Sequence, residues 1–382
     1  MKGGPAADVI VVGGGLIGSA IAWQLQASGL QVSIVTGERS AAASGVAAGM
    51  LAPVTEITFT EEKLLGLNLA SMQLYADFVQ QLEDVSGLPA GLRQTPTLSV
   101  AYNADDAARL TTLSNYLDRL GLSSTRLTSR ECRAHEPLLS PSIRSGLLVE
   151  GDWSCDNRLL WAALVEAGRR LGVLEVPGYV HAVLSAAGRV RGVMLADGSE
   201  LATTQVVLAN GAWASQISGL PDIPVRPVKG QILRLDPGRL PPPSLTVRAI
   251  SKGTEVYLVP RASGREVVVG ATVEELGFDA RVTAGGVYEL LRDARSVIPM
   301  TAEYALAETS VGWRPATPDN APILGRCDLD GLLLATGHYR NGVLLTPVTA
   351  AAITQLITEG ELPAAAHDFT LDRFSSRTEL LR

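Results

Sequence analysis

The sequence predicts an α/β fold in two parts: a Rossmann-type dinucleotide-binding domain and a second α+β domain built on a mostly antiparallel sheet. Residues 8–18 give a β-branched run followed by a glycine turn, and helical apolar spacing continues after it. Alternating strand patterns dominate residues 225–271. A second strand, glycine loop and helix occupies residues 331–359, so we expect the end of the chain to close back onto the first domain.

The first turn carries the most specific signal, because its glycines stand at G-x-G-x-x-G spacing. Gly13 allows the tight turn, Gly15 lets the backbone approach a pyrophosphate, and Gly18 lets the helix pack closely on the strand. The helix N-terminus then directs free N–H groups at the phosphates. Three such glycines alone are weak evidence, but the strand before them and the helix after them favour a dinucleotide site.

Composition narrows the class of protein further. The 382 residues are 46% hydrophobic, which is enough for two domains that each have a hydrophobic core. The net charge is −7 and there is no basic stripe, which argues against nucleic acid as a partner. The sequence contains no stretch of about 18 uncharged apolar residues, so we expect no membrane span. The first strand follows the N-terminus almost directly, so we expect no signal peptide and a cytoplasmic protein. The cysteines Cys132, Cys155 and Cys327 are too far apart to indicate a disulfide framework or a metal site.

The second strand, residues 32–35, ends where a dinucleotide fold usually places an acid for the ribose hydroxyls. Thr36 stands there instead, and Glu38 follows two residues later. A threonine hydroxyl can bind a ribose, whereas a charge-assisted hydrogen bond requires Glu38. Both residues are therefore candidates.

Residues 41–53 are almost all small. Such a run is typical of a tightly packed helix, but small side chains also let the backbone lie close to a flat ring system. Both interpretations stay open from the residues alone.

The remaining elements follow from apolar spacing and turn signals. Helices are predicted over residues 61–84, 104–120 with Asn103 as N-cap, 128–137, 156–167, 283–297 and 347–359. Strands are predicted over residues 97–102, 145–150, 179–183, 190–195, 205–213, 225–235, 247–250, 256–260 and 267–271. We expect residues 6–85, 151–220 and 325–370 to form the dinucleotide-binding domain, and residues 86–150 and 221–324 the substrate domain.

Six motifs in this order resemble the D-amino-acid oxidase family of flavoproteins, and within it the glycine oxidases of thiamine biosynthesis. The resemblance runs from about Asp8 to Phe374. Its specific parts are residues 13–18, 47–53, 228–231 (Val-Lys-Gly-Gln), 257–261 (Tyr-Leu-Val-Pro-Arg), 312–319 with Gly-Trp-Arg-Pro, and 336–342 (Thr-Gly-His-Tyr-Arg-Asn-Gly).

The resemblance implies FAD as cofactor, in a glutathione-reductase-like domain. Besides the three glycines, it implies cofactor contacts at Leu16 and Ile17 (pyrophosphate), Thr36 (ribose), Val180 (adenine), Ala43, Ser44, Ala48, Gly49 and Met50 (ring system), and His338, Tyr339, Arg340, Asn341, Gly342, Val343 and Leu344 (pyrimidine end). A glycine loop before a helix independently favours negative charge on the reduced ring. Gly-Trp-Arg-Pro lacks the cysteine to which related sarcosine oxidases attach FAD, so we expect a non-covalent flavin without a metal.

For the substrate, the resemblance implies that Tyr257 and Arg314 hold an amino-acid carboxylate, with Arg340 and Met50 close by. A guanidinium can bind a carboxylate through two parallel hydrogen bonds. The implied reaction passes the α-hydrogen to the flavin as hydride without a general base, and oxygen then gives hydrogen peroxide. A homotetramer is implied by the family alone.

Three departures keep other functions open. Many relatives have an acid at Thr36, Asp-Pro-Arg in place of residues 156–158, and a smaller residue in place of Trp313. The first prediction is therefore oxidation of glycine or a small glycine-like amine. A second is a paralogue that oxidises a larger N-substituted glycine, and a third is a flavin subunit that passes electrons to a partner protein.

Overall fold

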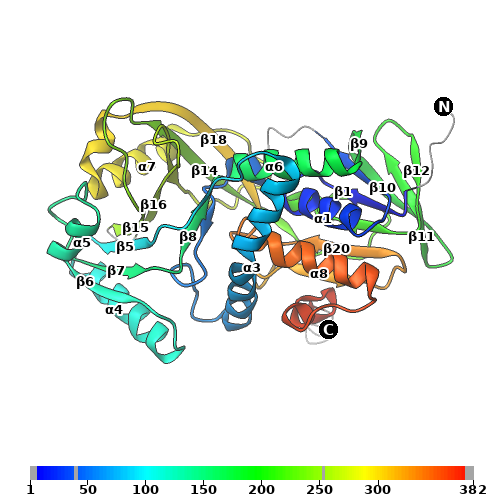
Figure 1. Ribbon diagram of the computed structural model, residues 1–382, viewed down its shortest axis with the longest axis horizontal. Helices are drawn as coiled ribbons and strands as arrows, with labels where there is room; N and C mark the ends of the chain where they lie inside the picture. Colours follow the sequence, from blue (N-terminus) through cyan, green and yellow to red (C-terminus); the bar gives the residue numbers. More distant parts are fainter. Residues whose placement is uncertain (1–6, 38–41, 252–253, 375–382) are drawn as a thin grey trace.

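Two large sheets, each assembled from interleaved segments of the chain, organise the computed structural model, which describes residues 7–37, 42–251 and 254–374 (Figure 1). The six-stranded sheet has the order β19-β20-β13-β1-β2-β9, and its strands are parallel except for β19. These strands are β1 (Val9–Val12), β2 (Val32–Thr36), β9 (Leu174–Pro177), β13 (Val206–Leu208), β19 (Ile323–Arg326) and β20 (Leu332–Thr336).

Both faces of this sheet are covered, which explains why its strands are apolar runs. Val9 and Val11 face a core formed with four helices, whereas Ile10 and Val12 face a second core formed with a three-stranded sheet. The helices are α1 (Leu16–Ala27), α3 (Glu62–Ser86), α6 (Asn157–Leu171) and α8 (Thr346–Thr358), and the small sheet holds β10 (Val180–Ala186), β11 (Arg189–Leu195) and β12 (Glu200–Ala202).

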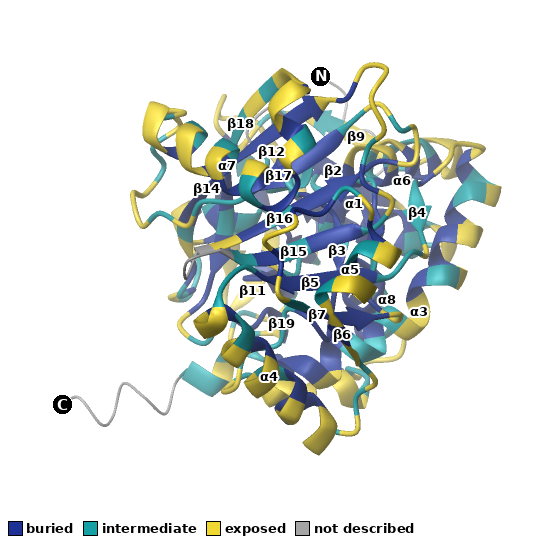
Figure 2. Ribbon diagram, turned by 90° about the vertical axis from the view of Figure 1, so that its left-hand side faces the viewer, coloured by how far each residue is buried: buried dark blue, intermediate teal, exposed yellow. Residues whose placement is uncertain are grey.

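The eight-stranded sheet forms the other half of the molecule, with the order β18-β14-β17-β16-β15-β5-β7-β6. All neighbours are antiparallel except β15 and β5. Helix α7 (Ala284–Val297) buries Leu290, Ala294 and Val297 against it, and Figure 2 shows the strands buried beneath exposed helix surfaces. The strands are β5 (Thr97–Ala101), β6 (Thr125–Thr128), β7 (Ser145–Val149), β14 (Arg226–Asp236), β15 (Thr246–Ser251), β16 (Thr254–Pro260), β17 (Val267–Gly270) and β18 (Ala305–Ala316).

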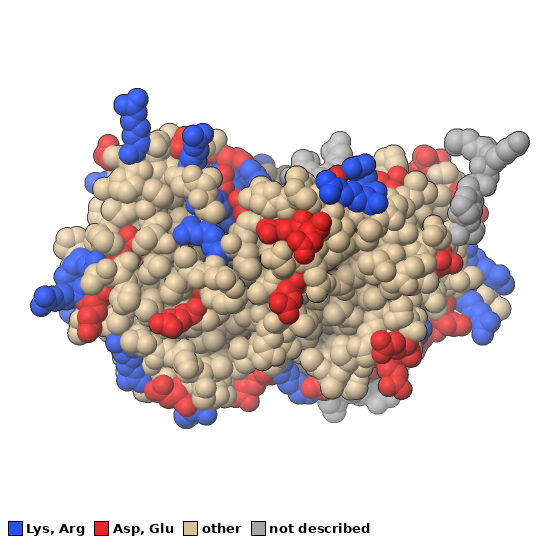
Figure 3. Space-filling model, viewed as in Figure 1, with Lys and Arg blue, Asp and Glu red and all other residues tan. Residues whose placement is uncertain are grey.

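Short elements connect the two halves. A three-stranded sheet joins β3 (Met50–Leu51), β8 (Trp153–Cys155) and β4 (Leu92–Arg93). Helices α4 (Ala104–Arg119) and α5 (Ser129–His135) lie at the outer end of the large sheet (Figure 1). On the face in Figure 3, acidic and basic side chains are interspersed. Across the described ranges, no helix has both the length and the apolar character needed to cross a membrane.

The predicted fold class is confirmed, and the helices begin and end within a few residues of their predicted limits. Asn103 caps α4, its side chain accepting a hydrogen bond from the Asp106 N–H. The predicted strand over residues 205–213 is wrong after Leu208, where β13 ends. Gly211 has a left-handed φ of 59°, and the 3₁₀ helix η1 (Gly211–Gln216) begins there. Glu38 lies outside the described residues.

We expect two helical glycines to respond oppositely to alanine. A Cβ at Gly18 in α1 would lie 1.8 Å from the Gly13 carbonyl oxygen, whereas a Cβ at Gly66 in α3 would meet nothing within 4 Å. Gly18→Ala should therefore lower the free energy of unfolding by about 1–3 kcal/mol or more, and Gly66→Ala should raise it by about 0.5–1 kcal/mol. Urea denaturation measures both. Equal effects at the two positions would contradict close helix–strand packing at Gly18.

Candidate functional site

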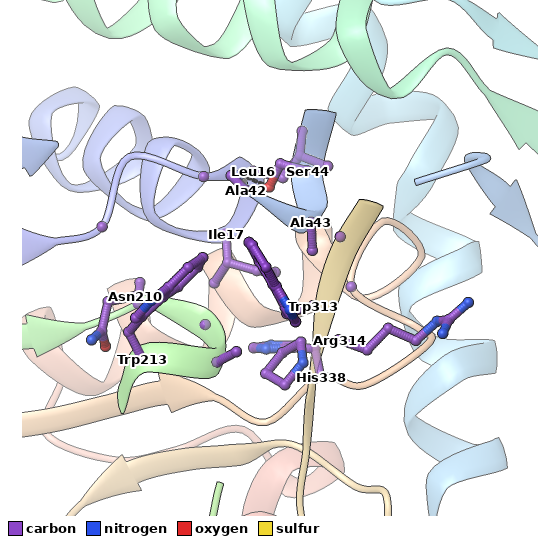
Figure 4. Close-up of a pocket in the computed structure, with 18 of the residues that line it drawn as sticks. Leu16, Ile17, Ala42, Ala43, Ser44, Asn210, Trp213, Trp313, Arg314 and His338 are labelled. Carbon is purple, nitrogen blue, oxygen red and sulfur yellow. Dashed lines mark hydrogen bonds between the residues drawn. The ribbon is translucent and has the colours of Figure 1, made fainter. Parts of the chain in front are cut away.

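A cavity of about 610 Å³ runs from the carboxyl ends of β1 and β2 to the face of the eight-stranded sheet (Figure 4). Gly13, Gly15 and Thr36 line its first end. Tyr257 and Arg314, from β16 and β18, line its far end. The cavity therefore crosses between the two halves of the molecule, at the edge where open α/β sheets bind ligands.

The N-terminus of α1 forms the first end. The Leu16 N–H donates to the Ser44 hydroxyl at 2.9 Å, the bond drawn in Figure 4, and no side chain caps the helix at Gly15. First-turn N–H groups have no partner within their own helix, so they favour an anion here. From α6, the Trp161 indole N–H donates to the Gly14 carbonyl at 2.8 Å. This hydrogen bond fixes the glycine turn to α6 at the cavity wall.

The run of small residues contains only one helical turn, α2 (Ala43–Val46), before the chain extends into β3. Ala42 to Met50 line one wall of the cavity except at Gly45. A packed helix therefore accounts for only part of the run, and much of the rest is backbone that lies along the cavity.

Buried polar side chains hold this wall from behind. Arg261, only 4% exposed, donates from Nη1 to the Ala48 carbonyl at 2.7 Å and from Nη2 to the Asn157 side-chain oxygen at 2.7 Å. The Asn157 amide in turn donates to the Ser44 carbonyl at 2.6 Å. Because Arg261 follows β16 and Asn157 begins α6, the wall is attached to both halves.

Two strand glycines make room for the side chains of Tyr257 and Arg314, the candidate substrate-binding residues. A Cβ at Gly270 would lie 2.3 Å from the Tyr257 hydroxyl, and one at Gly230 would lie 2.5 Å from Nη1 of Arg314. The same Nη1 donates to the Thr272 carbonyl at 3.1 Å, which orients the guanidinium. Burial raises the pKa of the Tyr257 phenol, and the positive charge of Arg314 opposes that rise. The phenol is therefore neutral and remains a hydrogen-bond donor at neutral pH.

His338 lies where β20 leads toward α8, and it lines the cavity. It is 3% exposed, and its Nε2 lies 3.0 Å from the Thr349 hydroxyl. Burial lowers its pKa to about 3, so the imidazole is neutral at physiological pH. The site therefore gains no positive charge from this histidine.

Aromatic rings border the cavity between its ends. Trp313 contacts Trp213 edge-on at 5.7 Å between ring centroids and also contacts Phe278 at 5.7 Å. On β18, Trp313 and Arg314 point to opposite faces, as successive strand residues do. Trp313 thus borders the cavity and packs into an aromatic cluster. Within the described structure, its indole Nε1 and the side-chain oxygen of Asn210 are buried without a protein partner.

The cavity brings together most of the residues predicted from the sequence. Among the described residues, Gly18, Asn341 and Leu344 are the predicted ones that do not line it. Gly18 packs on Gly13, and Leu344 is buried in the helical core. Their cofactor contacts, like the other predicted contacts, stay predictions. The sequence does not single out Trp161, Asn157 or Glu56 as site residues, because only long-range packing brings Trp161 and Glu56 to the cavity and Asn157 to the back of its wall.

Comparison with known proteins agrees with the predicted family. Residues 8–356 match the family described as FAD dependent oxidoreductase, DAO. The chain is 37% identical over 376 residues to the bifunctional protein ThiO/ThiG of Synechocystis sp., covering 97% of this chain and 54% of that protein. It is also 27% identical to the hydrogen cyanide synthase subunit HcnC of Pseudomonas aeruginosa, over 96% of both. The chain spans about half the length of the bifunctional relatives.

Two crystal structures give the same result for the fold. Glycine oxidase from Geobacillus kaustophilus superposes with a TM-score of 0.87 at 31% identity, covering 96% of this chain and 98% of that one. Iminodiacetate oxidase from Chelativorans sp. superposes with a TM-score of 0.85 at 27% identity, covering 95% and 98%.

The residues present fit FAD. The cavity is lined at one end by a helix N-terminus suited to a pyrophosphate and at the other by residues on the face of the second sheet. A Cβ at Gly14 would lie 2.5 Å from the Thr36 hydroxyl and one at Gly15 would lie 2.9 Å from the Ser44 hydroxyl, so only glycines let the turn pack against these two side chains, which themselves line the cavity. The unpartnered polar atoms of Asn210 and Trp313 are available to a bound polar group.

We expect Trp161→Phe to weaken FAD binding by about tenfold, because the Gly14 carbonyl loses the nearer of its two side-chain donors and keeps only the Ser19 hydroxyl at 3.3 Å. Fluorescence titration of the apoprotein with FAD measures this. Trp153→Phe is the matched control, since that indole donates to the Glu150 carbonyl and does not line the cavity. If both variants bind FAD equally, Trp161 does not position the glycine turn.

His338 should make the folded protein sensitive to acid. Its pKa is about 3 in the folded state, so below its ordinary value of about 6.5 the unfolded chain binds a proton that the folded chain does not. This contribution to stability is complete above about pH 6.5 and is lost as the pH falls toward 3. In urea denaturation, the wild type should lose about 2 kcal/mol more than His338→Gln between pH 7 and pH 5. Parallel losses in the two proteins would rule out a neutral, buried His338.

Proposed function

The chain belongs to the DAO family of FAD-dependent oxidoreductases, and on that premise we propose that it oxidises the C–N bond of glycine or a small glycine-like amine. Glycine loses its α-hydrogen as hydride and an amine proton, and water hydrolyses the resulting imine to glyoxylate and ammonia. The two electrons pass to oxygen, which becomes hydrogen peroxide. Bound FAD supplies the hydride acceptor in this reaction.

The observation that carries this proposal is the pairing of Arg314 with Tyr257 at the far end of the cavity. A guanidinium and a neutral phenol both donate hydrogen bonds, which is the combination that a carboxylate requires. Both side chains lie over glycines of the sheet, so their positions are fixed before a substrate binds. This arrangement orients the α-carbon relative to the rest of the cavity, and orientation lowers the entropic cost of reaction.

Other residues support the electrostatics of the reaction. His338 is neutral and stays neutral through the physiological range. The loop that begins at His338 precedes α8, whose N-terminus favours negative charge. Cys132, Cys155 and Cys327 do not line the described cavity, which supports a non-covalent flavin.

Two alternatives have support from particular relatives. The structural likeness to iminodiacetate oxidase favours a larger N-substituted glycine as the second candidate. The likeness to HcnC, a subunit by name, favours electron transfer to a partner protein as the third. Trp313 packs against Trp213 and Phe278 on the face opposite Arg314, so its bulk does not narrow the space around the Arg314 guanidinium.

Anaerobic bleaching of the flavin absorbance tests these candidates directly. Glycine, sarcosine and iminodiacetate are added in parallel to the purified holoenzyme. Rapid bleaching by glycine supports the proposal, and bleaching by iminodiacetate alone supports the second candidate. Bleaching by glycine without peroxide formation in air supports the third. A protein that binds no FAD, or a flavin that none of the amines reduces, contradicts all three.

We expect Arg314→Lys to raise the KM for glycine by at least about tenfold, because an ammonium cannot make two parallel hydrogen bonds to a carboxylate. Steady-state kinetics and acetate titration of the flavin spectrum measure the effect. Arg226→Lys is the control: Arg226 lies on the adjacent strand β14, is exposed, and pairs with Glu275. An unchanged affinity for acetate in Arg314→Lys would place the carboxylate elsewhere.

A further inference from the structure

Glu56 is the only acidic side chain among the described residues that line the cavity. The arginines among these residues are Arg314 and Arg340. The Glu56 side chain is 13% exposed, so its carboxylate is largely removed from bulk water. A cavity with two guanidinium groups and one carboxylate carries both signs of charge.

The fold fixes the position of Glu56 through its own turn. The Val54 and Thr55 N–H groups donate to the Asp152 carboxylate at 3.1 and 2.6 Å, and Asp152 is fully buried. The Glu56 N–H donates to the Ala52 carbonyl at 3.1 Å and closes the turn. Glu56 is therefore held in place by its backbone as well as by its side chain.

Arg248 connects Glu56 to the proposed carboxylate site. Arg248 on β15 stands directly opposite Tyr257 on β16, and its guanidinium lies 3.2 Å from the Glu56 carboxylate. Side chains directly opposite on neighbouring strands share one face of the sheet. The charge of Glu56 also raises the pKa of the Tyr257 phenol, after the larger effects of burial and Arg314. Glu56 and Tyr257 are thus within electrostatic reach of each other.

An ion pair with Arg248 does not by itself explain an acid in the cavity wall. Arg248 has a second carboxylate partner, Glu255, at 3.6 Å, and the Glu255 side chain is 64% exposed. Without Glu56, the described cavity would present only positive charge from its arginines and would repel a protonated amine. With it, the charge pattern matches a molecule that carries a carboxylate and an ammonium group.

We propose that Glu56 binds the ammonium group of a zwitterionic amino acid whose carboxylate is held by Arg314 and Tyr257. The inference rests on the proposed function for the place of the carboxylate, and it makes Glu56 the residue that distinguishes amino acids from simple carboxylic acids. Arg248 is a positioning residue that orients the Glu56 carboxylate. Selection comes from a charge-assisted hydrogen bond that an acid without an amine does not make.

The test compares two ligand types in the holoenzyme. Acetate and glycolate, which lack the amine, are titrated against the flavin absorbance to give a Kd. The Kd for glycine comes from the concentration dependence of anaerobic bleaching, or from displacement of acetate if glycine does not reduce the flavin. The variants are Glu56→Gln, the charge-preserving Glu56→Asp, and Glu255→Gln, which removes the other carboxylate partner of Arg248 from outside the cavity.

Glu56→Gln should weaken glycine binding by about tenfold to a hundredfold and leave acetate binding unchanged or tighter. Glu56→Asp should retain most of the glycine affinity, and Glu255→Gln should bind both ligands as the wild type does. Equal weakening of glycine and acetate in Glu56→Gln, or unchanged glycine binding, overturns the inference. Failure of glycine to reduce the wild-type flavin contradicts the proposed function instead, because displacement of acetate still reports on Glu56.

Discussion

The site depends on one buried cation, the guanidinium of Arg261. Arg261 directly follows β16 of the eight-stranded sheet. Its guanidinium donates to the Ala48 carbonyl in the cavity wall and to the side-chain oxygen of Asn157, the first residue of α6. A buried charge is tolerated only when it is paired and hydrogen-bonded, and Asp156 and Glu266 approach its Nε at 3.6 and 3.3 Å. Because these partners come from both halves, the wall cannot move with one half alone. The wall between the two ends of the cavity is therefore hydrogen-bonded to both halves of the molecule.

The glycine turn could be predicted because its signal is local. Gly13, Gly15 and Gly18 lie within one strand, turn and helix, and the geometry that they permit depends on few other residues. The end of β13 could not be predicted in the same way, because apolar residues continue past Leu208 although Gly211 turns the chain. Periodicity identifies burial, and burial also continues into η1.

The residues at the far end of the cavity could be predicted only from the resemblance of their motifs to a known family. Tyr257 and Arg314 are 57 positions apart in the sequence (314 − 257) and lie on different strands, and nothing in their local spacing indicates that they share a cavity. Trp161 and Glu56 show no sequence signal at all, since a tryptophan in an amphipathic helix and a single glutamate in a loop are ordinary in folded proteins. Their importance comes from the atoms they meet, such as the Gly14 carbonyl and the Arg248 guanidinium.

The interleaved order of the strands also governs when the site can exist during synthesis. β20 lies between β19 and β13 in the six-stranded sheet, yet its residues leave the ribosome after the whole eight-stranded sheet has been made. The glycine turn at residues 13–15 is made long before His338, and both line the cavity. The cavity is therefore closed by long-range contacts, which form slowly because distant segments must first meet. The complete cavity therefore requires residues made as late as His338, although the strand and helix at its first end are made much earlier.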